Sequence, residues 1–312
     1  MYVADLNVVF GKKEEPLIKH LDDIVLPALK ANLSIEASER TRYIFTDVEL
    51  NEIEENEYII QGILIKDTML DVMSEYSQEK GLEKTNKHFK SSPYSVFIIY
   101  LRNHRMVLVK NQPGSPDIRS FGSAAKQAMK LYISEQNQER KLNRAELLPM
   151  PKVHIAGIKT VQSVKEALKD VEKISKLVFK FYPLNTEWDY GSVFGQIDGA
   201  IRKAIVSKKG RMEFSSPQSK DGVAEIIEAT EGLVQTEMKV IYNSDLSLSG
   251  SKKKGTIKDS EISEVVNIDL NNELDKAYEE IYMNGKDIKA LGVQSKNNIM
   301  NYEEFLMKRK KK

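Results

Sequence analysis

Hydrophobic and polar residues alternate along the first third of the chain, which is the pattern of half-buried strands. Residues 3–10 alternate with one slip of register, and four further β-rich runs follow between residues 42 and 110. These runs are RYIFTDVEL, EYIIQGILI, YSVFIIYLR and RMVLVK. The last two meet at Asn103 and His104. Asparagine tolerates the left-handed backbone of a two-residue hairpin, so a tight turn is expected there.

Two segments of the first half instead carry apolar residues at helical spacing, three or four positions apart. The first helix is expected to begin at Pro16 and to kink at Pro27. A polar, charged stretch at 71–94 is expected to form a helical excursion and a loop. The apolar positions are Leu17, Leu21, Ile24 and Ala28 in one segment and Phe121, Ala125, Ala128 and Tyr132 in the other. The first half is therefore predicted to be an antiparallel meander with a helix on one face.

Strands and helices alternate in the second half. Pro149-Met-Pro151 cannot continue a helix, so it marks the expected boundary between a β-rich domain (1–148) and an α/β sandwich domain (149–300). A basic tail is expected at 301–312. The expected strands are VHIAG, KLVFKFY, RMEF, EMKVIYN and EVVNIDL, and the expected helices are 161–171, 192–207, 221–233 and 273–283.

Helices between short strands imply crossover connections and a mixed sheet in this half. The predicted class is α+β, with a ferredoxin-like or related sandwich as the first choice and a small doubly wound sheet as the alternative. Residues 243–262 are rich in polar residues and are expected to form a long loop between strands.

The composition excludes several classes of site. The chain of 312 residues contains no cysteine, which removes disulfides, thiolate nucleophiles and cysteine-based metal centres and suits a reducing compartment. The N-terminal segment lacks the pattern of a signal peptide, and no stretch approaches ~18 uninterrupted apolar residues. A cytoplasmic location without membrane contact is expected.

Charge is distributed unevenly along the chain. Residues 1–80 contain 8 Lys and Arg against 17 Asp and Glu, a net charge of −9, whereas residues 81–220 contain 25 against 12, a net charge of +13. The basic segment can form a surface for DNA or RNA, or the acidic segment can pack beside it and neutralise it.

The candidate nucleic-acid contacts lie in two clusters. One follows the expected helix 192–207, where cations also complement the helix dipole. The other belongs to Gly250–Thr256, which has the glycine spacing of a phosphate-binding loop but lacks the lysine after the second glycine. The residues are Arg202, Lys203, Lys208, Lys209 and Arg211 in the first cluster and Lys252, Lys253 and Lys254 in the second.

A nuclease is the catalytic alternative, with Asp221 preceding the tripeptide Glu237-Met238-Lys239, although a predicted helix separates them where a hairpin is wanted. The four histidines show no metal-binding spacing, and no dinucleotide or serine-hydrolase motif is present. No catalytic residue, metal or cofactor is therefore predicted.

The order of elements resembles an uncharacterised bacterial family of domains of unknown function associated with mobile elements and phage-defence islands. The segments VADLNVVF, YIFTDVEL, YIIQGILI and SVFIIYLRNHRMVLVKN carry the resemblance. It implies an accessory role in antiviral defence through foreign nucleic acid or a partner protein, and it implies no active site. The hypotheses are a non-catalytic nucleic-acid-binding subunit, a metal-dependent nuclease effector, and a protein-binding subunit or homo-oligomer that docks through its acidic first 80 residues.

Overall fold

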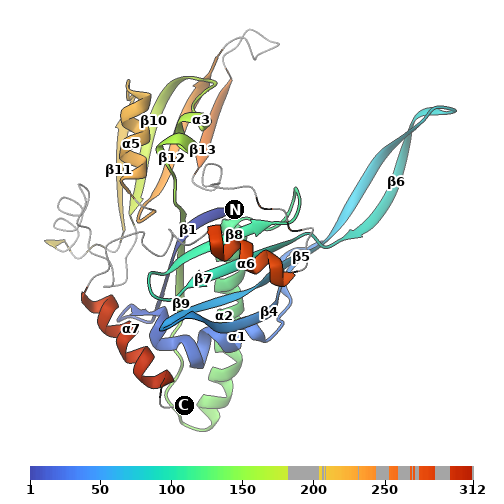
Figure 1. Ribbon diagram of the computed structural model, residues 1–312. Helices are drawn as coiled ribbons and strands as arrows, with labels where there is room; N and C mark the ends of the chain where they lie inside the picture. The colour runs from blue at the N-terminus through green and yellow to red at the C-terminus, as the bar shows by residue number, and fades with distance from the viewer. Residues whose placement is uncertain are drawn as a thin grey trace.

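Two antiparallel sheets organise the part of the chain that is described (Figure 1). We call them the large sheet, of nine strands, and the small sheet, of four. The computed structural model describes residues 1–181, 204–205, 207, 209–230, 232–243, 253–258, 268, 270, 274–284 and 296–310.

The large sheet curls into a half-barrel with strand order β2-β1-β8-β7-β5-β4-β3, while β6 pairs with β5 and β9 pairs with β1. The predicted antiparallel meander is confirmed, and a turn does precede β8. It is not the expected two-residue hairpin, because residues 101–104 separate the paired Tyr100 and Arg105, and the left-handed residue is His104 (φ 53°) and not Asn103. The strands are β1 (Tyr2–Phe10), β2 (Glu15–Pro16), β3 (Ile35–Ser38), β4 (Thr41–Glu54), β5 (Glu57–Ser77), β6 (Gly81–Ser91), β7 (Tyr94–Tyr100), β8 (Arg105–Lys110) and β9 (Pro151–Gly157).

Helices fill the concave side of the large sheet and also cover part of its other face. The predicted helix near 17–28 is a 3₁₀ turn (Leu17–His20), a π turn (Leu21–Val25) and α1 (Leu26–Lys30) in succession. The second predicted helix is α2 (Ile118–Leu142), capped by Asp117. Its Phe121 packs edge-to-face against Phe45 and Phe97 in the main core. Helix α6 (Leu274–Asn284) packs Ala277 and Ile281 in a cluster on the opposite face.

The helical excursion predicted at 71–94 is wrong, because these residues extend β5 and form β6 and the start of β7. Beyond Thr68, which pairs with Thr41 of β4, no other strand of the described residues lies beside the β5–β6 hairpin. We call residues 69–90 the arm; it projects away from the body of the molecule (Figure 1). Register set inside the large sheet continues outward along the hairpin and overrides the weak strand propensity of its charged residues.

The C-terminal residues return to the large sheet. The expected basic tail is a helix, α7 (Lys296–Arg309), with Tyr302 and Phe305 buried in the main core. The Tyr302 hydroxyl donates to the Asn56 carbonyl and accepts from the Tyr58 amide. Strand β9, expected in the second domain, likewise joins the large sheet by pairing along β1. Non-local packing therefore decides both placements.

The small sheet has strand order β11-β10-β12-β13. Every described pair in it is antiparallel, so the predicted mixed sheet is wrong. The helix between β11 and β12 does make a crossover, because β10 lies between those two strands. The elements are α3 (Val161–Ala167), β10 (Val171–Phe181), β11 (Gly210–Ser215), α5 (Lys220–Glu228), β12 (Gln235–Tyr242) and β13 (Lys254–Lys258).

Some predicted elements of the second half lie outside the described residues. They include almost all of the helix 192–207 and most of EVVNIDL. The loop expected at 243–262 contains β13, which pairs with β12. No helix in the described part of the chain is long and apolar enough to cross a membrane.

Candidate functional site

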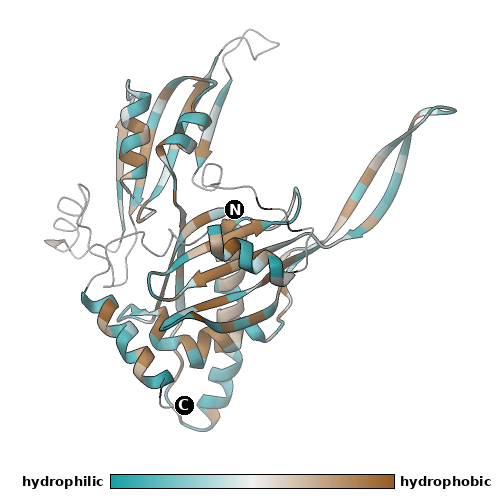
Figure 2. Cartoon of the chain, viewed as in Figure 1, coloured by the Kyte–Doolittle hydropathy of each residue, from teal (hydrophilic) through white to brown (hydrophobic). Residues whose placement is uncertain are grey.

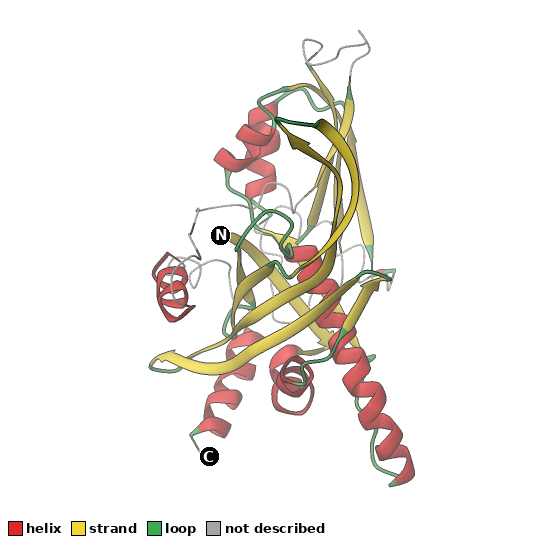
Figure 3. Cartoon of the chain, turned by 90° about the vertical axis from the view of Figure 1, so that its right-hand side faces the viewer, coloured by secondary structure: helices red, strands yellow, loops and turns green. Residues whose placement is uncertain are grey.

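The two faces of the small sheet differ in their cover. Helices α3 and α5 lie on one face, where Val164 and Ile227 join a core with Phe179 and Val240 (Figure 3). Directly opposed residues of antiparallel neighbours point to the same side, so the register identifies the side chains on the other face. We call it the cationic face: Lys173, Lys176, Lys180, Arg211, Lys239, Lys254 and Lys258, with the carboxylates Glu213 and Glu237.

The two carboxylates neutralise only part of this charge. Glu213 binds Lys176 at 2.5 Å and Arg211 at 2.6 Å, and these hydrogen bonds lower its pKa. Glu237 binds Lys180 at 2.6 Å, which lowers its pKa in the same way. Within the described residues, neither Lys239 nor Lys254 makes an ion pair, and both are exposed. The face therefore presents excess positive charge to solvent.

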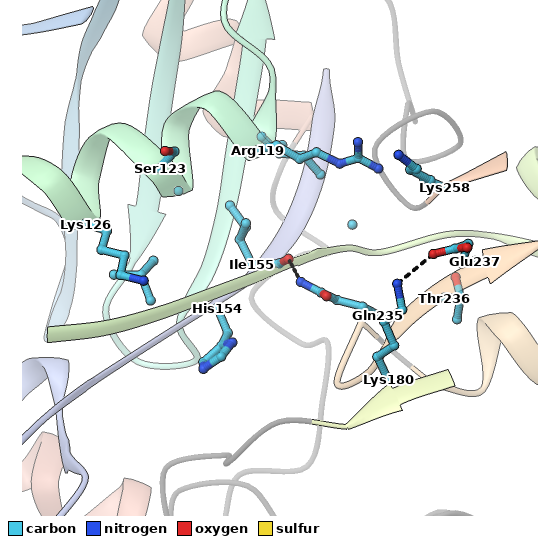
Figure 4. A pocket seen from close by; sticks show the side chains of 14 residues that line it. Arg119, Ser123, Lys126, His154, Ile155, Lys180, Gln235, Thr236, Glu237 and Lys258 are labelled. Atoms are coloured by element: carbon cyan, nitrogen blue, oxygen red, sulfur yellow. Dashed lines mark hydrogen bonds and ion pairs between the residues drawn. The ribbon is translucent and has the colours of Figure 1, made fainter. Parts of the chain in front are cut away.

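A cleft of about 510 Å³ continues the cationic face toward the large sheet (Figure 4). Helix α2 supplies Arg119 and Lys126, and the small sheet supplies Lys180 and Lys258 opposite them. Arg119 and Lys126 share one side of the helix because they lie two turns apart. Gly122 lies between them, where an added Cβ would come within 2.8 Å of Ile155 on β9. The glycine thus lets β9 pack close to α2 and form the cleft wall.

The cleft is basic in composition, and its lining includes His154 of β9. Burial, and after it the nearby Lys126, Lys209 and Lys152, lower the pKa of this ring to about 4. His154 is therefore neutral at pH 7, and Glu237 is the carboxylate that lines the cleft, already paired with Lys180. Such a site favours an anionic group.

The structure separates the two clusters of candidate contacts predicted from the sequence. Arg211 lies on β11 and Lys254 on β13, at opposite edges of the small sheet. Three strand spacings give about 14 Å between these edges. Lys209 precedes β11 and acts on His154 in the cleft, and Lys253 lies 5.9 Å from the Tyr242 ring centroid. Arg202, Lys203, Lys208 and Lys252 lie outside the described residues.

The three residues of the nuclease hypothesis do not form one site. Asp221 belongs to α5 and pairs with Lys165 of α3 at 2.8 Å, on the helix-covered side of the small sheet. Glu237 and Lys239 point to the cationic face on the opposite side. The described residues also contain no cluster of three or more His, Asp or Glu side chains suited to a metal ion.

No protein-family model matches the chain. No curated protein matches it either. Its function is therefore inferred from geometry and charge.

Several of the site residues escaped the sequence-based prediction. Lys176 and Lys180 on β10 and Lys258 on β13 belong to the cationic face, although none was selected. Lys239 on β12 was selected only for the nuclease hypothesis. The signal of the three unselected lysines is the period of two within KLVFKF and KGTIK, where lysines alternate with apolar residues. Arg119 and Lys126 of α2 were harder to predict as site residues, because no local pattern in the sequence indicates which helix lies beside the small sheet.

A buried ion pair lies within the large sheet, close to the point where Gly232 of the second half approaches it. The guanidinium of Arg105 donates to the Asp5 carboxylate at 3.2 Å, and both side chains are fully buried. Gly232, just before β12, has a φ of +75° and packs against Asp5 and β9. An added Cβ would come within 2.8 Å of Ile158 and 3.3 Å of the Ala156 carbonyl.

Replacing Gly232 with alanine is expected to destabilise the protein by about 1–3 kcal/mol, because a side chain is strained at this φ and meets backbone. Urea unfolding at pH 7 measures the change. Gly114→Ala is the matched control, since its φ is +89° but nothing lies within 4 Å of the added Cβ. Equal losses of stability in the two variants would show that the crowding of an added Cβ at Gly232 does not contribute to the destabilisation.

Proposed function

We propose that the chain binds nucleic acid non-catalytically through the cationic face and the adjoining cleft. The observation that carries the proposal is the alignment of seven lysine and arginine side chains on one face of four described strands, opposite the face that α3 and α5 cover. Phosphates are the matching partner, because neutralising them with Lys and Arg releases condensed counterions.

Contact is expected with the backbone of the nucleic acid rather than with its bases. The apolar members of the described cationic face are Val178 and Ile241, and it carries no aromatic side chain on which a base can stack. Lysine contacts to phosphate carry no sequence information. DNA and RNA of different sequence should therefore bind with similar affinity.

Binding is expected to fall steeply with salt. If about five cations meet phosphates, the association constant drops by about 10²–10³-fold between about 50 and 200 mM monovalent salt. Fluorescence anisotropy with labelled single-stranded and double-stranded DNA and RNA measures the slope. Absence of salt-dependent binding to all of them would falsify the proposal.

Two variants test whether this face is responsible. The double substitution Lys239→Gln/Lys254→Gln is expected to weaken binding and to reduce the salt slope by about 2, one for each phosphate contact. Lys30→Gln/Lys141→Gln is the matched control, because it removes two exposed cations, from the end of α1 and from the end of α2, that make no ion pair within the described residues. An equal loss in both pairs would assign binding to overall charge and not to the face.

A role in a bacterial antiviral-defence or mobile-element system is part of the proposal and rests on the family resemblance of the sequence. A nuclease role has less support, since Asp221 and Glu237 lie on opposite sides of the small sheet.

A further inference from the structure

The cationic face and the cleft share part of their charge. The strands of the small sheet alternate hydrophilic and apolar residues (Figure 2), which gathers their charged side chains on one face. Lys180 and Lys258 belong both to this face and to the lining of the cleft. A phosphate backbone on the cationic face can therefore continue into the cleft without leaving positive charge.

The size of the cleft decides what can enter it. Its volume of about 510 Å³ falls in the range of about 300–1,000 Å³ that is usual for sites of single small molecules. A double helix keeps paired bases between two backbones, which are separated by grooves about 6 and 12 Å wide. The cleft is too small for such a duplex, but it has room for a few nucleotides of one strand.

Positive charge comes from both walls of the cleft. Helix α2 contributes Arg119 and Lys126, and neither makes an ion pair within the described residues. Figure 4 shows the Arg119 side chain pointing toward Lys258. The carboxylate in the described lining, Glu237, already binds Lys180. Four cations against one carboxylate leave a net charge of +3, which an anionic strand would balance.

The two cations of α2 indicate how much of a strand the cleft can hold. Arg119 and Lys126 are seven residues apart, which is about 10 Å along the helix axis at about 1.5 Å per residue. Successive phosphates of a stacked strand lie about 3.4 Å apart along its axis. The two side chains thus span about three nucleotides.

The arrangement of these cations favours a strand over a small free anion. A site for one phosphate gathers its donors around a single point, as at a helix N-terminus. Arg119 and Lys126 instead lie at separate turns of α2. Lys180 and Lys258 continue the series onto the small sheet, where the cationic face begins. Phosphates that are joined in one chain match a series of this kind.

We infer that the cleft holds about three unpaired nucleotides at the end of a duplex that lies on the cationic face. The protein should accordingly prefer a duplex with a single-stranded overhang to a blunt duplex. This inference rests on the proposed function, because it assigns the cleft its own part in the binding of nucleic acid.

Fluorescence anisotropy with three labelled duplexes tests the inference. The first duplex is blunt, the second carries an overhang of about three nucleotides, and the third is blunt and longer by about three base pairs. The overhang duplex is expected to bind about tenfold tighter than either blunt duplex at about 100 mM salt, the effect of one or two further phosphate contacts. The longer blunt duplex has more phosphates than the overhang duplex, so total charge predicts the opposite order.

The length of the overhang provides a second measurement, which needs no variant. Affinity should rise as the overhang grows to about three nucleotides and then level off, because further phosphates lie beyond the cations of the cleft. Both 3′ and 5′ overhangs are measured, and a gain with either polarity supports the inference. A steady rise with length would assign the gain to charge alone and would contradict the role of the cleft.

Variants assign the gain to the walls of the cleft. Arg119→Gln/Lys126→Gln is expected to bring the affinity ratio of the overhang and blunt duplexes down to about one, since each glutamine keeps helix propensity and removes a charge. Lys239→Gln/Lys254→Gln changes residues that do not line the cleft. It should weaken the binding of both duplexes and leave their ratio as in the wild type.

The control Lys30→Gln/Lys141→Gln should retain both the affinity and the ratio of the wild type. If the blunt duplex binds with steep salt dependence and no overhang improves binding, the inference is overturned and the proposed function stands. A ratio that survives Arg119→Gln/Lys126→Gln would also overturn the inference. If no duplex and no single strand binds, the proposed function fails and the inference fails with it.

Discussion

Arg105→Met is expected to destabilise the protein by about 3–5 kcal/mol at pH 7, the loss typical of breaking a buried ion pair. The guanidinium is fully buried and donates to Asp5 across the β1–β8 pairing. Its removal leaves the Asp5 carboxyl group in the interior without that cation. Urea unfolding followed by circular dichroism measures the loss.

The same substitution at the surface provides the control. Arg42 pairs with Asp67 at 2.8 Å, but the two side chains are 54% and 31% exposed. Arg42→Met should therefore cost at most about 1 kcal/mol. Asp5→Leu/Arg105→Met should be more stable than Arg105→Met alone, since it removes both charges. If Arg105→Met cost no more than Arg42→Met, the buried pair would not stabilise the fold.

The spacing of apolar residues within a short segment correctly predicted those strands and helices that bury one regular face. The alternation around Val3 and Val8 gave β1, and the helical spacing of Phe121 and Ala125 gave α2. The strands of the arm were not predicted. Both faces of a ribbon in solvent carry polar residues, so the sequence of a charged run such as 83–90 resembles that of a helix or a loop. Strand β9 was misplaced because its partner β1 lies more than 140 residues earlier.

The candidate site was predictable only in part, for a related reason. The sequence drew attention to consecutive cations, such as Lys208 and Lys209, whereas the cationic face takes single residues from four strands. Arg211 and Lys254 were identified, but only the register shows that they share a face. The buried pair of Asp5 and Arg105 had no sequence signal, since the two residues lie 100 positions apart.

The stability of the protein is expected to depend on pH through Asp5. Burial raises the pKa of this carboxyl group from 3.8 to about 6, while Arg105 and His104 act in the opposite direction. The folded state thus holds the proton at a pH where the unfolded chain has released it. Stability contributed by Asp5 is therefore greatest below about pH 4 and is lost as the pH rises through about 6.

Unfolding free energies of the wild type and of Asp5→Asn, measured between about pH 4.5 and 7, isolate this contribution. The wild type should lose about 2 kcal/mol relative to the asparagine variant across that range. Subtracting one curve from the other cancels the contributions of groups that both proteins share. These include Glu213 and Glu237, whose lowered pKa values make stability rise with pH. A flat difference curve would mean that the Asp5 carboxyl group titrates alike in both states.

Arg105→Met links the two predictions, because it removes the cation that holds the Asp5 pKa down. The pKa of Asp5 should then rise further, and the carboxyl group should stay protonated to a higher pH. The destabilisation by Arg105→Met is accordingly expected to be smaller at pH 5 than at pH 7. A loss independent of pH would assign the effect to the packing of the arginine stem and not to its charge.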